Sequence, residues 1–288
     1  MSQQERSPFG AARHLAGRIV RRGRRTARAV AASVRLVLEP PASERALRRR
    51  LVASGARLVP LQPSRVWEAW RNRPLRTSGE VDQACAALTA AGLPLHGDRP
   101  KNWDLLVALG ALLDGVPKTG AVLEMGATQY SRVLPWLYLY GYRSLRGIDL
   151  VYDAPVLAGP IRYDEMDLTK TTFADASFDG IANLSVIEHG VDLDAYLREA
   201  SRLLRPGGVL VTSTDFWCEP VDTGGQEAYG VPIRIFGPAD MEGFVALAAG
   251  HGLELRGTLD LACDERAVEW RRFGLHHTFI NIVLHKAA

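Results

Sequence analysis

The chain is poor in cysteine, and the few cysteines that it has do not indicate a disulfide framework. Its 288 residues include three of them, Cys85, Cys218 and Cys263. The number is odd and no two have the Cys-x-x-Cys spacing, which argues against a disulfide-stapled scaffold and against a cysteine zinc site. We therefore expect a reducing compartment and three buried thiols without a chemical role.

Long hydrophobic runs are also missing. The sequence is 47% hydrophobic, yet no stretch approaches the roughly 20 apolar residues that a membrane-spanning helix needs. The length is enough for one substantial core, or two smaller ones. These properties predict a soluble globular protein, and we expect it in the cytoplasm or at the inner face of the membrane.

Lysine is scarce, and the two charge signs are unevenly distributed. Four of the 35 basic residues are lysines, and residues 1–100 hold 19 of those 35 but only 7 of the 32 acidic residues. A basic N-terminal region thus precedes an acidic body. Because arginine replaces lysine throughout, the arginine content alone is weak evidence for nucleic-acid binding.

The basic region, residues 1–99, is predicted to be largely helical, with about ten disordered residues at its start. Residues 11–38 have apolar positions on one side of a helix and many arginines on the other. A basic amphipathic helix of this kind binds anionic membrane surfaces, which predicts peripheral membrane contact. A solvated or packing helix explains the same pattern, and both interpretations remain open.

Residues 100–288 are predicted to form a single α/β domain. From residue 120 onward, strand-like and helix-like segments alternate, which favours a mostly parallel sheet with right-handed crossovers. The expected strands are 121–125, 145–149, 162–167, 178–184, 209–214, 253–258 and 277–285. A turn at 205–208 and a long loop at 216–236 complete the pattern, and we expect the loop to shape a substrate pocket.

The loop after the first expected strand contains one glycine. Gly126 is followed by Ala-Thr-Gln-Tyr-Ser, whereas a dinucleotide fold needs Gly-x-Gly-x-x-Gly to seat a pyrophosphate. Glu124 precedes this glycine, and Asp149 ends the next strand, where an acid can accept both hydroxyls of a ribose. The pattern indicates a nucleotide-type ligand without a pyrophosphate.

These motifs resemble those of class I S-adenosylmethionine-dependent methyltransferases, in the branch that acts on small molecules and sugars. The resemblance rests on Val122-Leu-Glu-Met-Gly126, Asp149, Asp167-Leu168, Ser185-Val-Ile-Glu-His189 and the Leu-Arg-Pro-Gly-Gly turn that ends at Gly208. It implies a Rossmann-like, seven-stranded, mostly parallel sheet with an antiparallel last strand. It also implies methyl transfer to an oxygen or nitrogen of a small-molecule or glycan acceptor.

The same resemblance implies the site residues, with S-adenosylmethionine as cofactor. The residues that would contact this cofactor are Glu124, Gly126, Ala127, Thr128, Asp149, Leu150, Asp167, Leu168 and Ser185. His189 is the candidate general base, although a histidine at a helix start also bonds to backbone. No metal is expected, since His276 and His277 point to opposite faces of a strand and no carboxylate–histidine cluster is visible.

Two other functions remain open. Thr128 stands where the family usually has a second glycine, which suggests a module that binds the cofactor or a partner without turnover. A nucleic-acid methyltransferase would grip phosphates with the basic N-terminus. Against this second alternative, the body is acidic and Leu184-Ser-Val-Ile187 replaces the Asn/Asp-Pro-Pro-aromatic motif, so no nucleic-acid partner is expected.

Overall fold

The computed structural model describes residues 40–128, 131–151 and 156–288. The predicted helix at 11–38, and with it the predicted membrane contact, lies outside these residues. Within the described ranges, every helix is too short or too polar to cross a membrane.

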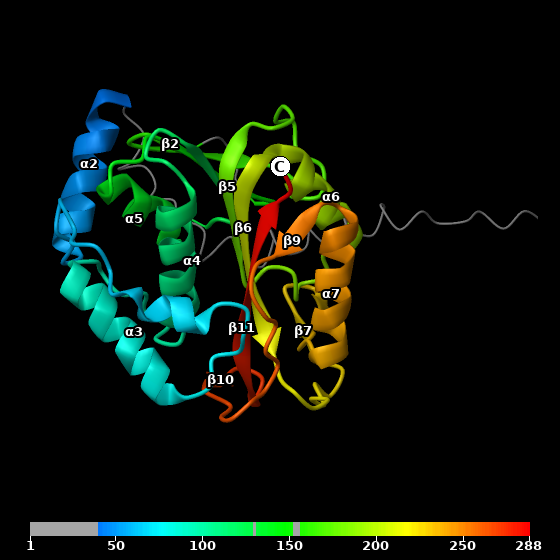
Figure 1. The fold of residues 1–288 in the computed structure, drawn as a ribbon. Helices are drawn as coiled ribbons and strands as arrows, with labels where there is room; N and C mark the ends of the chain where they lie inside the picture. Colours follow the sequence, from blue (N-terminus) through cyan, green and yellow to red (C-terminus); the bar gives the residue numbers. More distant parts are fainter. Residues whose placement is uncertain (1–39, 129–130, 152–155) are drawn as a thin grey trace, which may run out of the picture.

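A single large sheet organises the described chain (Figure 1). Its strand order is β10-β11-β6-β5-β1-β2-β4-β3, and β9 also pairs with β11. The strands are β1 (Ala121–Met125), β2 (Ser144–Asp149), β3 (Val156–Ala158), β4 (Ile161–Glu165), β5 (Phe178–Leu184), β6 (Leu204–Phe216), β9 (Leu253–Leu255), β10 (Val268–Trp270) and β11 (Leu275–Lys286). A separate hairpin joins β7 (Glu227–Ala228) to β8 (Val231–Pro232).

The strand directions confirm the predicted Rossmann-like class. Strands β4, β2, β1, β5 and β6 run parallel, and β11 is antiparallel to both β6 and β9. The last strand, β11, is therefore antiparallel, as the sequence predicts, and it lies between β6 and β9. Two strands of this sheet were not predicted, and neither was the β7–β8 hairpin. Strands β3 and β10 are three residues long and pair antiparallel at the two edges of the sheet, and such short segments carry no alternating pattern of their own.

The predicted turn at 205–208 is part of strand β6. Phe178 pairs with Leu204 and Gly180 pairs with Val209, so the two strands shift register between these pairs. Pro206 cannot donate a ladder hydrogen bond, and bulges are where strands accept proline. The turn residues therefore form an irregularity within one long strand and do not end it.

Helices cover both faces of the sheet. On one side lie α2 (Pro40–Ala53), α3 (Ser78–Ala91), α4 (Lys101–Gly115) and α5 (Val133–Leu139); on the other lie α6 (Leu193–Leu203) and α7 (Pro238–Gly250) (Figure 1). A short 3-10 helix, Arg65–Trp70, packs on α4. Each face has its own apolar cluster, because strands of a parallel sheet are buried on both sides.

Helix α4 lies at the centre of the first layer. Every residue from Asn102 to Leu112 is buried, and the helix contacts β5, β6 and β11. Its N-terminal end reaches the edge of the sheet at which the parallel strands end. Lys101, at the first position of α4, is thereby brought beside the loops that follow β5 and β6.

The segment before α3 is bound to the last strand. Asn281 Nδ2 donates to the Trp70 carbonyl, and Asn72 Oδ1 accepts from the backbone of Val283, both at 2.8 Å. Leu75 N–H donates to the Phe279 carbonyl at 2.8 Å. The apolar cluster under this face includes residues from 47 to 283, so part of the basic N-terminal region shares the core of the sheet.

Gly110 offers a test of this packing. A Cβ built on Gly110 would lie 2.3 Å from the Trp67 ring, so Gly110→Ala should lower the free energy of unfolding by about 1–3 kcal/mol through overpacking. The matched control is Gly243→Ala on exposed α7, where a Cβ meets nothing within 4 Å and alanine should stabilise by about 0.5–1 kcal/mol. Urea denaturation measures both, and equal effects would contradict the packing.

Candidate functional site

The loop after β1 lies against the end of β2. The backbone N–H groups of Gly126 and Ala127 both donate to the Ile148 carbonyl, at 2.8 and 2.9 Å. Gly126 has a φ of 77°, and a Cβ there would lie 2.3 Å from Val186 Cγ2. Glycine is thus required for both conformation and space, and this close approach brings the ends of β1, β2 and β5 together.

Glu124 lies beneath this loop with 4% of its surface exposed. Burial raises the pKa of its carboxyl to about 7, although hydrogen bonds from the Ser131 hydroxyl and the Leu134 N–H act in the opposite direction. Its Oε2 has no hydrogen-bond partner within the described residues. One part of the carboxyl therefore caps the start of α5, and a buried acceptor atom is left over.

Asp149 ends β2 and is half-buried. Its Oδ1 accepts the Val151 N–H at 3.3 Å, and burial raises the pKa of its carboxyl. The two following side chains are unusually exposed for aliphatic residues, Leu150 at 66% and Val151 at 69%. A partly desolvated carboxylate thus stands beside an open apolar surface.

Asp167 and Leu168 follow β4, next to that surface. The Met166 N–H donates to the Asp149 carbonyl at 2.9 Å, which ties the two strand ends together. Asp167 Oδ1 accepts from both the backbone and the hydroxyl of Thr169, whereas Leu168 is 8% exposed. Asp167 therefore stabilises its own turn and is exposed at this edge of the sheet.

Ser185 and Thr128 follow β5 and β1 at the same edge of the sheet. Ser185, directly after β5, has a φ of 53°; its N–H donates to the Ser213 carbonyl at 2.9 Å, and its hydroxyl accepts from Lys101 Nζ. Thr128 is exposed, and its N–H donates to the Ser131 hydroxyl at 3.0 Å. The structure thus brings all nine predicted cofactor residues to one edge of the sheet.

A cavity of about 210 Å³ opens beside Ser185. It lies beyond the ends of β5 and β6 and reaches the start of β11. Its lining residues are mostly ionisable or aromatic: Asp98, Lys101, Ser185, Glu188, His189, Asp215, Tyr229, Val268, Glu269, Trp270, His277 and Phe279. Tyr229 comes from the long loop at 216–236, so that loop does contribute to a pocket.

His189 lies on the wall of this cavity, where its ring meets the edge of Tyr229 at 5.0 Å between centroids. Burial lowers the pKa of the imidazole below its ordinary value, and Lys101 adds to this, whereas Asp215 acts in the opposite direction. The ring is therefore neutral at neutral pH. A neutral imidazole in a cavity has the lone pair that a proton acceptor needs.

Three further ionisable side chains lie deeper in the cavity wall. Glu188, Asp215 and His277 are 2%, 6% and 1% exposed. His277 Nε2 lies 3.1 Å from Asp215 Oδ1, but neither ring nitrogen makes an aligned hydrogen bond within the described residues. Burial and the Asp215 carboxylate raise the pKa of Glu188, so this group holds its proton at neutral pH.

Lys101 is the one lysine among the cavity residues, and its surroundings fix it. Its Nζ lies 3.7 Å from Asp104 Oδ2 and 3.9 Å from the centroid of the Phe279 ring. Asp104 is fully buried and accepts from the Ser213 hydroxyl at 2.8 Å. The ammonium group of Lys101, at the first position of α4, thereby lines the cavity.

Sequence reasoning missed most of this cavity. It named Ser185 and His189, and it did not consider Lys101 or Glu188 for the site. His277 was discussed with His276, and the structure confirms that they face apart, since His276 is exposed and His277 is buried. Glu188 lies within the quoted Ser185–His189 segment, but Lys101 comes from a helix 84 residues before Ser185, and no local pattern signals that contact.

The described residues contain no group of three or more His, Cys, Asp or Glu side chains able to hold a metal ion.

Comparison with known families identifies the sheet. Residues 123–212 match the family described as a methyltransferase domain. The match begins within β1 and ends within β6, so it spans the Gly126 loop, Asp149, Asp167, Ser185 and His189. This part of the chain is therefore similar to a methyltransferase domain.

Individual relatives are more distant. A protein of Mycolicibacterium smegmatis, described as a probable S-adenosylmethionine-dependent methyltransferase, is 40% identical over 75 residues, which make up 24% of this chain and 29% of that protein. The chain thus matches less than a third of that relative's length.

Solved structures with similar folds include two methyltransferases. The S-adenosylmethionine-dependent enzyme of Mesorhizobium loti is 16% identical, with 61% of this chain and 96% of that chain covered and a TM-score of 0.44. The 1,6-didemethyltoxoflavin-N1-methyltransferase of Burkholderia thailandensis, bound to 1,6-didemethyltoxoflavin and S-adenosylhomocysteine, is 17% identical, with 75% and 92% covered and a TM-score of 0.46.

The buried acid under the loop predicts a pH dependence of stability. The folded chain holds the Glu124 proton up to a pKa of about 7, against an ordinary value of 4.5. The folded state therefore binds more protons than the unfolded state between these values, and its stability falls as the pH rises through them. Glu124→Gln should remove up to about 3 kcal/mol of this decline between pH 5 and 8.

Urea denaturation at several pH values measures the effect. The control is Glu242→Gln, an exposed position on α7, whose unfolding free energy should follow the wild-type pH curve. A Glu124→Gln curve that also runs parallel to wild type would contradict the raised pKa.

Proposed function

We propose that this chain binds S-adenosylmethionine in the cleft from Glu124 to Ser185 and transfers its methyl group to an oxygen or nitrogen of a small polar acceptor. One observation carries the proposal: the motif residues at the ends of β1, β2, β4 and β5 adjoin a cavity of about 210 Å³ that shares Ser185. A donor cleft and an acceptor cavity that meet at one residue suit transfer between two bound molecules.

The residues present fit this cofactor. Asp149 is a half-buried carboxylate placed to accept ribose hydroxyls, and Leu150, exposed at 66%, offers an apolar surface for an adenine ring. The leftover Oε2 of Glu124 is a buried acceptor suited to an ammonium group or an ordered water. Asp167 and Leu168 would border the base. When bound, S-adenosylmethionine supplies an electrophilic methyl group on a sulfonium sulfur.

The chain's own task is alignment and proton removal. The cavity walls would hold the acceptor in line with the cleft, where orientation lowers the barrier. His189 is proposed as the general base because its imidazole is neutral and lines the cavity. Tyr229 packs on the ring edge and restricts its rotation.

The cavity also favours one acceptor class. Besides the protonated Glu188, the lining includes three carboxyl groups, Asp98, Asp215 and Glu269, against a single lysine, Lys101. Such a lining disfavours polyanionic acceptors, so we propose a small molecule or the end of a glycan rather than a nucleic acid. A hydroxyl or amine donor would find acceptors on several walls.

Thr128 motivates a second candidate, a module that binds the cofactor without turnover. The side chain replaces a family glycine at the loop that would face the methionine part of the cofactor. Binding and turnover measured separately distinguish the two candidates.

Asp149→Ala tests the cleft. Calorimetric titration with S-adenosylmethionine and S-adenosylhomocysteine should show binding to the wild type and at least a tenfold weaker affinity for the variant, about 1.4 kcal/mol or more, because charge-assisted hydrogen bonds are lost. Glu254→Ala, an exposed acid on β9, should bind normally. Absence of binding to folded wild-type protein would refute both candidates.

His189→Gln tests the cavity. With an acceptor found by screening for S-adenosylhomocysteine release, kcat should fall by about 10²- to 10⁴-fold, while calorimetric affinity for S-adenosylhomocysteine stays unchanged. Because burial lowers the pKa of His189 from 6.5, the wild-type rate should begin to fall only below that pH. An unchanged kcat would assign the proton to another group.

A further inference from the structure

The fold brings two of the three cysteines together. Cys218 directly follows Trp217 at the exit of β6, and Cys263 lies between β9 and β10. The Cys218 backbone N–H donates to Cys263 Sγ at 3.0 Å, so the two cysteines are neighbours in the fold. Both residues are partly exposed, whereas Cys85 is buried in α3. The expectation of three buried thiols is therefore wrong for this pair.

Neighbouring contacts hold both sides of the pair in place. The Trp217 N–H donates to the Phe236 carbonyl at 3.0 Å, which closes the base of the loop that follows β6. The Arg266 guanidinium lies over the Trp217 ring at 4.6 Å, and the Asp260 N–H donates to the Asn72 carbonyl at 2.9 Å. The hydrogen bond from Cys218 to Cys263 and the Arg266–Trp217 contact therefore join the same two segments.

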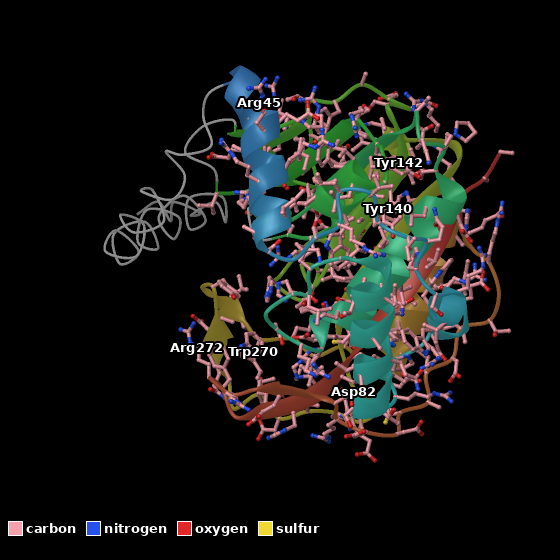
Figure 2. All side chains as sticks on the ribbon, turned by 90° about the vertical axis from the view of Figure 1, so that its left-hand side faces the viewer. Arg45, Asp82, Tyr140, Tyr142, Trp270 and Arg272 are labelled. Atoms are coloured by element: carbon pink, nitrogen blue, oxygen red, sulfur yellow. The ribbon has the colours of Figure 1, made fainter. Side chains whose placement is uncertain are left out.

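The pair stands at the base of two walls of the cavity. Residues 217–236 carry Tyr229, and the segment after Cys263 leads into β10, whose residues Val268, Glu269 and Trp270 line the cavity. Trp270, which is labelled in Figure 2, also packs against the apolar cluster that contains Ala228 of the β7–β8 hairpin. A covalent link between Cys218 and Cys263 would therefore fix the two walls relative to each other.

We propose that Cys218 and Cys263 form a reversible intramolecular disulfide by exchange with an oxidised low-molecular-weight disulfide such as oxidised glutathione. The Cys218 thiolate attacks one glutathione sulfur and releases the first glutathione thiolate. Cys263 then loses its proton and attacks the Cys218 sulfur, which releases the second glutathione thiolate. In total, the two protein thiols lose two electrons, and these reduce one glutathione disulfide to two thiols.

The reduced pair is the resting state in a reducing compartment. Burial and the neighbouring Cys218 thiol raise the pKa of Cys263, so its thiolate is scarce at neutral pH. The second exchange step should therefore be faster at pH 8.5 than at pH 7. The pair would respond to a sustained oxidising load rather than to brief fluctuations.

The test is a thiol count on the full chain after incubation with oxidised glutathione. The three thiols should fall to one, measured in denaturant, and peptide mapping should find Cys218 joined to Cys263 with Cys85 free. Cys85→Ala should still form the link. Cys218→Ser and Cys263→Ser should each form none, and a reductant should restore all wild-type thiols.

Two further measurements keep the outcome interpretable. The serine variants should keep the wild-type circular dichroism spectrum, so that loss of the link is not loss of the fold. Trypsin cleavage after exposed Arg266 should slow in the oxidised wild type, because the segment is held at Cys263, and stay unchanged in oxidised Cys218→Ser.

Retention of three thiols at pH 8.5, or glutathione attached singly to either cysteine without an internal link, would overturn the proposal. Neither result depends on methyl transfer, so the thiol count stands apart from the proposed function.

Discussion

Backbone pairing of β5 with β1 on one side and β6 on the other brings three strand ends to one edge of the sheet. Everything proposed for the site depends on this pairing. The Gly126 loop and Ser185 follow β1 and β5, Asp215 lies at the end of β6, and parallel strands bring their carboxyl ends to a common edge. The antiparallel insertion of β11 beside β6 then adds His277 and Phe279 to the same edge. The proposed cofactor residues and the cavity thus lie at the same edge of the sheet.

The second constraint is electrostatic. Glu124, Glu188, Asp104 and Asp215 are buried or nearly so, and an isolated carboxylate in such surroundings is strongly disfavoured. Burial accordingly raises the pKa values of the Asp104, Glu124 and Glu188 carboxyl groups. Lys101 also lies close to Asp104. Glu188 and Asp215 line the cavity, and buried ionisable groups beside a cavity indicate a functional site. They make the cavity polar although the sheet around it is apolar.

Helix α4 connects the N-terminal segments to this chemistry. It is buried against β5, β6 and β11 and directs Lys101 toward Ser185. The segment near Asn72 is bound along β11 and also to the chain near Asp260, which in turn lies close to Cys263. Residues before the matched methyltransferase domain therefore help to shape the cavity. Lys101, His277 and the cysteine pair all lie outside the matched residues 123–212.

The sequence by itself determined the fold class and the strand ends at which Glu124, Gly126, Asp149 and Asp167 lie, because the apolar runs of these strands and the residues that follow them are visible locally. Short edge strands such as β3 carry too few residues for a pattern, and the β6 irregularity looked like a separate turn because Pro206 and two glycines punctuate it. Only the tertiary structure decided that Lys101, Glu188, Asp215 and His277 share a cavity, and that Cys218 meets Cys263. These contacts join residues distant along the chain through sheet order and helix packing, and no local periodicity encodes them.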